Sequence, residues 1–304
     1  MGTCDISKKI RNTGSASCKI QWDIIDKGLF IPNKTDVIPN DNPEDIKDWI
    51  DQKIQAAKKE ERLYPMALLN GFEDTSEDLK TANTGYGDIV ILGDGAKSAN
   101  GQYEQDVNYT KKLRSFNKVE GRIIFVLRDG SIALTRNSAG RLQGFLCQPY
   151  FSQGKLPNGT DLNTSIMNIS FKSPQELEDR VEIIPLDISA TDLDGLFDIR
   201  LENIAPPSGG MPVSAEIKLF NDLTGADVTA LYQQSLAVPS AWIVKDLNGN
   251  TTSVTPTYNS NLESFTSTSL QQGYTISLAD PFVLSTLQPI PVLGIEGMNT
   301  ITVQ

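Results

Sequence analysis

The fold is decided by residues 122–134, which read RIIFVLRDGSIAL. After its arginine the run 122–127 is apolar without alternation, a pattern that predicts a strand buried on both faces. Asp129-Gly130 follows, and Asp-Gly between two apolar runs is a strong hairpin signal. Residues 132–134 supply the returning strand. We therefore expect a β-hairpin deep inside a sheet that is covered on both sides.

Further strands and two short helical segments are expected around this hairpin. The segment 109–116 has the pattern of a short helix, and 174–179 has that of a helical turn. Apolar or alternating runs predict strands at 88–92, 142–150, 163–171 and 181–184. A chain so rich in strands suits assembly through exposed sheet edges.

The region before residue 62 is expected to hold an N-terminal arm and one α-helix. Asp41-Asn42 and Pro43 are helix-start signals, and apolar residues recur at helical spacing through 43–62. Residues 1–40 alternate polar stretches with short apolar ones, so we expect an arm with one or two short strands that lies on a neighbour. Residues 41–186 then form a β domain with the helix 43–62 on its flank.

Residues 187–304 differ from the rest in composition and in pattern. Thr, Ser and Asn are more frequent there, and seven short strands are expected at 197–204, 213–220, 241–247, 253–258, 263–269, 274–278 and 299–303. This spacing predicts an Ig-like β-sandwich without the disulfide of antibody domains. Trp242, on the third of these strands, is expected in its core. The predicted fold class is therefore mainly β throughout.

Composition limits the chemistry that this chain can perform. The 304 residues are 39% hydrophobic and 21% charged, which is enough to bury a large core in one or two domains. The sequence contains no histidine, which excludes Ser-His-Asp and Cys-His catalysis and histidine-ligated metals. We expect no enzyme activity, and we assign no catalytic, cofactor-binding or metal-binding residue.

The charge is acidic and unevenly placed. Lys and Arg number 27 against 38 Asp and Glu, and the net charge of -11 argues against electrostatic attraction to DNA or to an anionic membrane. From residue 187 onward there are 12 acidic and 3 basic residues, whereas 26 acidic and 24 basic residues precede it. This break predicts a domain boundary between residues 186 and 194.

Cysteines and targeting signals indicate where the chain is made. Cys4, Cys18 and Cys147 are too few and too scattered for a zinc tetrad or a disulfide framework. The N-terminus is polar where a secretory signal is apolar, and no apolar run reaches the length of a transmembrane helix. We therefore expect synthesis in a reducing intracellular compartment and no membrane anchor.

The order of these elements resembles the virion structural proteins of tailed bacteriophages, and most of all a major tail tube protein with a C-terminal Ig-like domain. The segments that carry the resemblance are KKLRSFNKVEGRIIFVLRDGSIALT at 111–135, AGRLQGFLCQPYF at 139–151 and the module from 187 onward. It is a resemblance of layout across most of the chain. It implies a tail-tube-like β-sandwich or barrel with a flanking α-helix, followed by an Ig-like β-sandwich.

The resemblance also implies a function. Such proteins self-assemble into hexameric rings that stack into the tube of the phage tail, and viral DNA passes through the bore without specific binding. The Ig-like part would decorate the outside. The implied partners are neighbouring copies and other virion proteins, such as a tail terminator, a sheath or a baseplate hub. The implied location is the virion tail, after synthesis in the host cytoplasm. A neck, tail-completion or capsid-associated protein could share this layout.

Two other functional classes stay open at this point. Ig-like sandwiches often bind surfaces, and Trp22, Trp49 and Trp242 could stack on sugars of a carbohydrate ligand. A histidine-free enzyme could use paired carboxylates, as glycosidases do. The densest acidic cluster consists of Asp187, Asp192, Asp194 and Asp198. Such clusters are more often acidic linkers or incidental cation sites, so both classes rank below a self-assembling structural protein.

Overall fold

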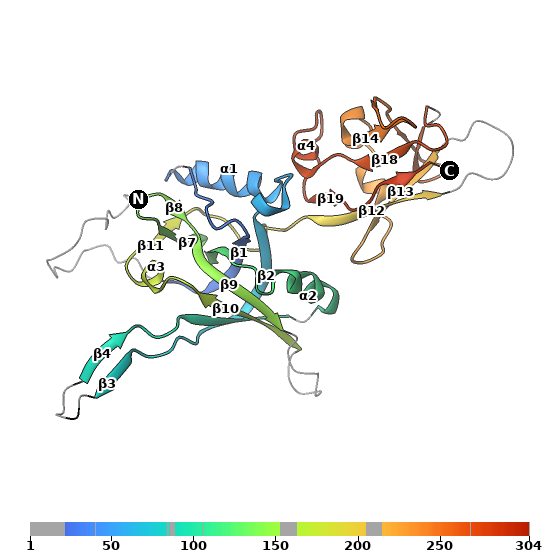
Figure 1. Ribbon diagram of the computed structural model, residues 1–304. Helices are drawn as coiled ribbons and strands as arrows, with labels where there is room; N and C mark the ends of the chain where they lie inside the picture. Colours follow the sequence, from blue (N-terminus) through green and yellow to red (C-terminus); the bar gives the residue numbers. More distant parts are fainter. Residues whose placement is uncertain are drawn as a thin grey trace.

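The computed structural model describes residues 22–39, 41–83, 85, 89–104, 106–152, 163–204, 215–267 and 269–303. Figure 1 shows two lobes, one built from the N-terminal two thirds of the chain and one from the C-terminal third. Strand β12 (Phe197–Ile204) leads from the first lobe into the second. The strands form mostly antiparallel sheets, and the expected mainly β fold class is confirmed.

The first lobe is a closed barrel of six antiparallel strands. In order around the barrel they are β1 (Ile25–Ile31), β2 (Tyr64–Asp74), β5 (Ser98–Glu104), β10 (Thr164–Phe171), β9 (Phe145–Ser152) and β6 (Gly121–Leu127). Strand β6 pairs back with β1 along six residue pairs and so closes the barrel. The expectation of assembly through exposed sheet edges does not hold for β6 and β9, which the sequence predicts at 122–127 and 142–150, because barrel closure gives these strands partners within the chain.

The hairpin predicted at Asp129-Gly130 is present and joins β6 to β7 (Ser131–Arg136). Gly130 has φ of 82°, and the Asp129 carboxylate accepts a hydrogen bond from the Ser131 backbone N–H at 2.9 Å. Strands β8 (Leu142–Gln143) and β11 (Val181–Pro185) both pair with β7 outside the barrel.

Every residue of β6 is buried, as predicted, because the strand lies between two hydrophobic cores. Ile123, Phe125 and Leu127 point into the barrel, together with residues of β1, β5, β9 and β10. Ile124 and Val126 point outward against helix α1 (Pro43–Ile54), which covers that side of the barrel. Both faces of the strand are therefore apolar, and the sequence shows no alternation.

Residues 25–31 correct the expected N-terminal arm. The arm was expected to span 1–40, but 25–31 form a central barrel strand in which Leu29 and Phe30 are fully buried. A Cβ on Gly28 would lie 2.8 Å from Ile123 Cδ1, so the strand packs closely on β6. Residues 1–21 lie outside the described residues.

Helix α1 is shorter than the predicted 43–62. It ends at Ile54, and a single 3₁₀ turn, η1 (Lys59–Glu61), follows before β2. The expected apolar stripe stops there because Ala57 is exposed. The chain turns back instead, and the Leu63 backbone N–H donates to the Lys53 carbonyl at 3.0 Å.

The remaining elements of the first lobe connect or extend the barrel. Helix α2 (Val107–Leu113) with η2 (Arg114–Phe116) and helix α3 (Pro174–Glu178) lie where short helical segments were predicted. Strands β3 (Lys80–Asn83) and β4 (Ile89–Gly93) pair only with each other and form a hairpin that continues β2 and β5 beyond the barrel.

The second lobe consists of two sheets around one core. The first sheet has the order β16 (Thr257–Asn259), β17 (Ser264–Ser267), β13 (Ala215–Asn221), β12 and β19 (Ile295–Gly297). The second has the order β15 (Thr251–Thr252), β14 (Trp242–Lys245), β18 (Thr275–Leu278) and β20 (Ile301–Thr302). Short helical segments η3 (Thr229–Tyr232), η4 (Pro239–Ala241) and α4 (Pro281–Ser285) connect them. Buried side chains of both sheets form a single cluster.

Trp242 lies in this core, as the sequence predicted. It is 5% exposed, its ring stands edge-on to Phe265 at 5.4 Å between centroids, and its indole N–H donates to the Leu236 carbonyl at 2.8 Å. The large aromatic ring therefore joins strands of both sheets and has a partner for its polar atom.

The predicted boundary at residue 187 lies too early. Leu186, Ala190 and Leu193 are buried in the outer core of the first lobe, and the Gly130 carbonyl accepts a hydrogen bond from the Ile188 backbone N–H at 3.2 Å. The second lobe begins only at β12. The acidic composition of 187–196 suggested that this segment belongs to the second lobe. Its four spaced apolar residues pack on the first lobe instead.

A fragment of residues 1–196 should unfold at a higher temperature than a fragment of 1–186. Loss of 187–196 uncovers the outer core and removes Leu193, at a cost of about 3 kcal/mol in the free energy of unfolding. Thermal unfolding of both fragments, followed by circular dichroism, measures the difference. Equal melting temperatures would contradict the assignment of 187–196 to the first lobe.

Trp242→Ala should unfold the second lobe at a cost of about 3 to 5 kcal/mol, because it leaves a large cavity between the two sheets. Ile243→Ala is the matched control, since Ile243 is the next residue and is 38% exposed. Urea unfolding of the full chain measures both variants. If Trp242→Ala costs no more than the control, the ring is not part of the core.

Candidate assembly surfaces

Three carboxylates of the acidic cluster lie beside bases of the first lobe. Asp198 forms an ion pair with Lys112. Asp192 and Asp194 lie near Lys27, whose Nζ donates to the Leu193 carbonyl at 2.7 Å. Burial lowers the pKa of Lys27, and the two aspartates oppose this effect. These carboxylates therefore stabilise cations of the first lobe. The fourth, Asp187, has φ of 55° in the turn that starts the 187–196 segment.

The cysteines and the possible metal ligands offer no reactive site among the described residues. Cys147 is completely buried, and burial raises the pKa of its thiol, which therefore stays protonated and unreactive. Cys4 and Cys18 lie outside the described residues. Within the described part of the chain, no group of three or more Cys, Asp and Glu side chains is arranged to hold a metal ion.

The tryptophans do not form a sugar-stacking surface on the second lobe. Trp49 and Trp242 are 8% and 5% exposed. Trp22 is 45% exposed, but it belongs to the first lobe, where its ring contacts Phe125 and Phe145. Of the three tryptophans considered for carbohydrate binding, Trp49 and Trp242 therefore pack in the cores of the two lobes.

The outer face of β5, β10 and β9 is broad and polar, with Lys118 and Lys172 beside its strands. Directly opposite residues on antiparallel strands share a face, so Asn100, Asn168 and Tyr150 form one row across the three strands. A second row consists of Ser98, Ser170 and Gln148. These rows line a shallow hollow of about 390 Å³. Of all residues in the three strands, only Glu104 is charged.

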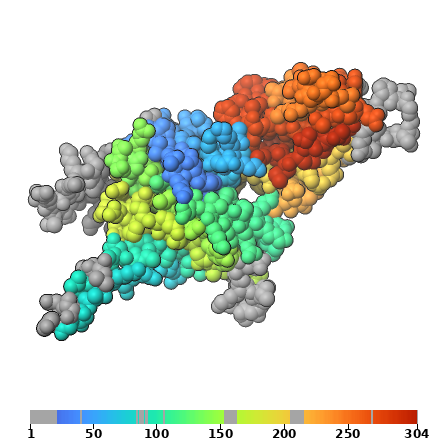
Figure 2. Space-filling view, in the orientation of Figure 1, coloured from blue at the N-terminus to red at the C-terminus, as the bar shows by residue number. Residues whose placement is uncertain are grey.

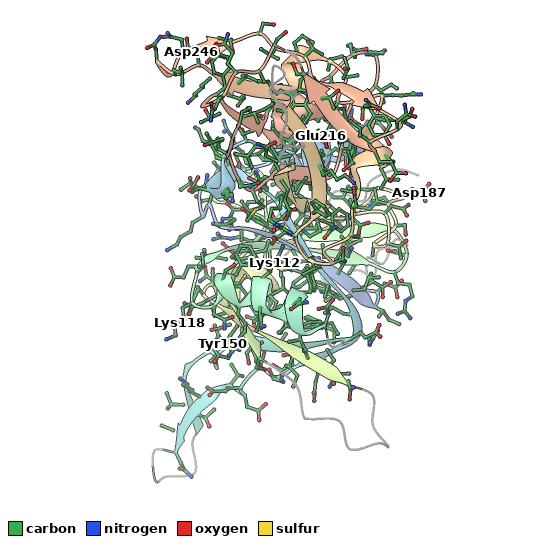
Figure 3. The ribbon with its side chains drawn as sticks, turned by 90° about the vertical axis from the view of Figure 1, so that its right-hand side faces the viewer. Lys112, Lys118, Tyr150, Asp187, Glu216 and Asp246 are labelled. Carbon is green, nitrogen blue, oxygen red and sulfur yellow. The ribbon has the colours of Figure 1, made fainter. Side chains whose placement is uncertain are left out.

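This polar face was not anticipated from the sequence. Residues 98–104 read SANGQYE, with small and amide side chains that have low strand propensity. The signal that could have found the strand is its alternation, in which Ala99, Gly101 and Tyr103 are buried and the residues between them are not. Figure 3 shows Tyr150 in the half of the molecule from which the β3–β4 hairpin projects, far from Asp246 at the opposite end.

The β3–β4 hairpin projects from the barrel, and no other strand of the described ranges pairs with it. Figures 1 and 2 show it extending away from the body of the first lobe. Leu79 and Val90 are 54% and 46% exposed. At its base the Glu77 backbone N–H donates to the Ala96 carbonyl at 2.9 Å, and a Cβ on Gly95 would lie 2.2 Å from the Glu77 carbonyl oxygen. The two arms of the hairpin therefore approach each other very closely where they leave the barrel.

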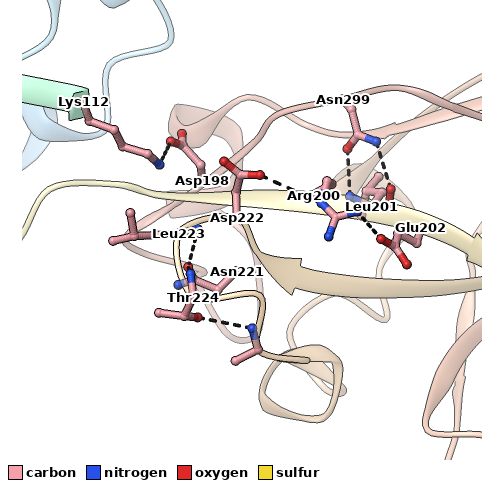
Figure 4. Close-up of polar contacts among 11 residues, drawn as sticks. Lys112, Asp198, Arg200, Leu201, Glu202, Asn221, Asp222, Leu223, Thr224 and Asn299 are labelled. Atoms are coloured by element: carbon pink, nitrogen blue, oxygen red, sulfur yellow. Dashed lines mark hydrogen bonds and ion pairs between the residues drawn. The ribbon is translucent and has the colours of Figure 1, made fainter. Parts of the chain in front are cut away.

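Ion pairs hold the two lobes together. Arg62, which is 3% exposed, donates from Nη1 to Glu296 Oε2 at 2.7 Å and from Nε to the Ala56 carbonyl at 2.9 Å. The second pair, Lys112 with Asp198, joins α2 to the start of β12 (Figure 4). In both pairs the base belongs to the first lobe and the acid to the second.

The middle of β12, beyond its pairing with β19, is supported by a side chain. The Asn299 amide accepts a hydrogen bond from the Leu201 N–H at 2.8 Å and donates one to the Leu201 carbonyl at 2.9 Å (Figure 4). It thus imitates a neighbouring strand at that point. Separately, none of the helices in the described ranges is long and apolar enough to cross a membrane.

Glu296→Gln should weaken the attachment between the lobes. It leaves the buried Arg62 guanidinium without its carboxylate, at a cost of about 2 kcal/mol. A lower melting temperature and a larger radius of gyration by small-angle X-ray scattering are expected. Lys59→Met is the control. Lys59 pairs with the same carboxylate at 3.7 Å but is 61% exposed, and exposed ion pairs contribute little to stability. Equal effects of both variants would show that Arg62 does not depend on Glu296.

No family model matches the chain, and neither a curated protein nor a solved structure matches it. The functional argument therefore depends on the surfaces described above.

Proposed function

We propose that this chain is a non-enzymatic virion structural protein that assembles into stacked rings, as the major tail tube protein of a tailed bacteriophage. The observation that carries the proposal is the β3–β4 hairpin, which projects from a closed barrel and has no core of its own. The hexameric ring order and the virion tail as location follow from the resemblance in layout. The partners are further copies of the chain and the virion proteins at the ends or outside of the tube.

The hairpin favours assembly because an isolated two-stranded ribbon is only marginally stable in water. Both of its strands have a free edge in the described residues, and Leu79 and Val90 expose apolar surface on it. Packing against a neighbouring copy would cover that surface and pair the edges. A projection along one direction suits contact between successive rings.

The polar barrel face suits the wall of a DNA-conducting bore. A surface that carries Lys or Arg would bind DNA through counterion release, and passage requires weak contact. The faces of β5, β10 and β9 present amides and hydroxyls in the rows of Asn100 and Ser98, with Glu104 as the one charged residue of these strands. Such a surface is hydrated, and its bases, Lys118 and Lys172, lie at its margin outside the three strands.

The second lobe supports an Ig-like assignment through its strand order. If β12 to β18 and β20 are lettered along the chain, with β15 as C′, the sheets read D-E-B-A and C′-C-F-G, the arrangement of an Ig-like sandwich. Strand β19 adds to the first sheet by parallel pairing with β12. We place this acidic module on the outside of the tube, away from the bore.

The rival functions find less support. A neck or capsid-associated protein would share the two-lobe layout and would also supply a neighbour for the hairpin, so the choice of the tail tube rests on the resemblance in layout. A carbohydrate-binding Ig-like module would need exposed aromatic residues on the second lobe, and Trp242 is buried there.

Replacement of residues 78–95 by Asn-Gly tests the proposal. Because Glu77 and Ala96 are already hydrogen-bonded neighbours, a two-residue turn can join β2 to β5 without altering the barrel. Negative-stain microscopy of the purified chain at high concentration should show rings and tubes. The shortened variant should fold with an unchanged far-ultraviolet spectrum and form no tubes.

The matched control is Leu262→Asp, which adds a charge at an exposed apolar residue of the second lobe. It should leave tubes intact, whereas Leu79→Asp with Val90→Asp should abolish them. If the full chain stays monomeric at every concentration, or if the shortened variant still forms tubes, the proposal fails.

A further inference from the structure

The mouth of the barrel contains an aromatic pocket of about 540 Å³. It is formed where β1 and β5 begin and where β2, β6 and β10 end, so it lies at one open end of the barrel. Its walls include Trp22, Phe72, Phe125 and Phe171, with Ile25 and Leu177 beside them. The Phe72 and Phe125 rings meet edge to face at 5.5 Å. This wall belongs to neither the polar face nor the hairpin described above.

The rim of this pocket is acidic. Asp23, Asp74 and Glu178 line it against a single base, Lys97, which already forms an ion pair with Glu178 at 2.6 Å. The Asp74 carboxylate accepts a hydrogen bond from the Ser76 backbone N–H at 2.8 Å, and hydrogen bonds from Ser76 lower the pKa of Asp74. Asp74 is therefore an anion at neutral pH. Aromatic walls with excess carboxylates suit an occupant that is both apolar and cationic.

The chain itself contains a segment of that chemistry. Residues 1–21 read MGTCDISKKIRNTGSASCKIQ and have four bases against one acid, in a chain whose net charge is -11. Ile6 and Ile10 flank the pair Lys8-Lys9. The segment leads directly into Trp22, which is part of the pocket wall. Fully extended, it reaches about 70 Å, far enough to meet the barrel of an adjacent copy.

We propose that the barrel-mouth pocket of one copy binds the basic, isoleucine-containing segment 6–11 of a neighbouring copy. The inference rests on the proposed self-assembly and identifies a contact for it. Isoleucine side chains fill the aromatic pocket, and the lysines and the arginine pair with the carboxylates of the rim. A closed barrel leaves few strand edges for assembly, so a segment exchanged between copies supplies a contact that edges cannot.

Cross-linking between two forms of the full chain tests the contact. The acceptor carries Ser76→Cys in the pocket with Cys4→Ser and Cys18→Ser, and is tagged to increase its mass. The donor is the natural chain, whose Cys4 and Cys18 flank segment 6–11. Cys147 does not react in either form because it is completely buried. A short bis-maleimide reagent should join tagged to untagged chains.

The control acceptor has Asn248→Cys in place of Ser76→Cys, in the exposed 246–250 turn at the far end of the second lobe. It should give only background cross-linking. Lys8→Glu, Lys9→Glu and Arg11→Glu together in the donor should reduce the specific product about tenfold. Asp74→Lys with Glu178→Lys in the acceptor should restore the product with this reversed donor.

Three results would overturn the inference. The first is an equal yield of cross-linked product with both acceptors, and the second is a yield that does not change on charge reversal. The third concerns a chain that carries Ser76→Cys and both natural cysteines, in which mass spectrometry finds only intramolecular links. The last would mean that each pocket binds its own segment. Tubes seen by microscopy without cross-links would reject this inference and leave the proposed function standing. Cross-links without rings or tubes would reject the proposed tube and leave the contact between segment 6–11 and the pocket standing.

Discussion

The pairing of β1 with β6 is the constraint on which the rest of the first lobe depends. It closes the barrel, and glycines at two positions of the pair leave room for a backbone oxygen and for a side chain of the opposite strand. A Cβ on Gly121 would lie 2.3 Å from the Ile31 carbonyl oxygen, and one on Gly28 would lie 2.8 Å from Ile123 Cδ1. Once β1 is in place, β6 has an inner face toward the barrel and an outer face toward α1. The two cores of the lobe are thus the two sides of a single strand pair.

Closure of the barrel leaves backbone groups without strand partners, and polar side chains bind to them. Strand β6 pairs with β9 over Gly121 to Ile123 and with β7 farther on, so the sheet divides at that point. Arg122 lies there, 9% exposed, donating from Nη1 to the Gly144 carbonyl at 2.7 Å, while Glu176 of α3 accepts from the Leu146 N–H at 2.7 Å. Farther along β9, the Asn117 amide bonds to both backbone groups of Phe151. These side chains satisfy backbone groups that barrel closure leaves unpaired.

Sequence patterns predicted the strongly apolar elements and missed those fixed by distant contacts. Segment 122–134 and Trp242 carry local signals, because unbroken apolar runs and Asp-Gly turns need no knowledge of the partner strand. Strand β1 was assigned to an arm of short strands and not to the barrel, since Lys27 and Gly28 interrupt its apolar pattern. The burial of Lys27 depends on the Leu193 carbonyl, 166 residues away. Strand β5 was missed for a related reason: its amides and hydroxyls indicate a loop until the neighbouring strands are known. The polar face that it forms with the predicted strands β10 and β9 was missed with it.

The uneven charge, which indicated two regions in the sequence, also explains how the lobes are held together. With the boundary at β12, the first lobe has 29 acidic and 24 basic residues, and the smaller second lobe has 9 acidic and 3 basic ones, so the second is more acidic for its size. Pairs across the junction combine a base of the first lobe with an acid of the second, as in Arg62 with Glu296 and Lys112 with Asp198. The same imbalance makes the second lobe repel other acidic surfaces, including DNA and its own copies. Around a ring, that repulsion is smallest when the acidic lobes lie farthest from the axis. In the proposed tube, the charge distribution would therefore favour an outer position for the second lobe and would leave the polar barrel face to line the bore.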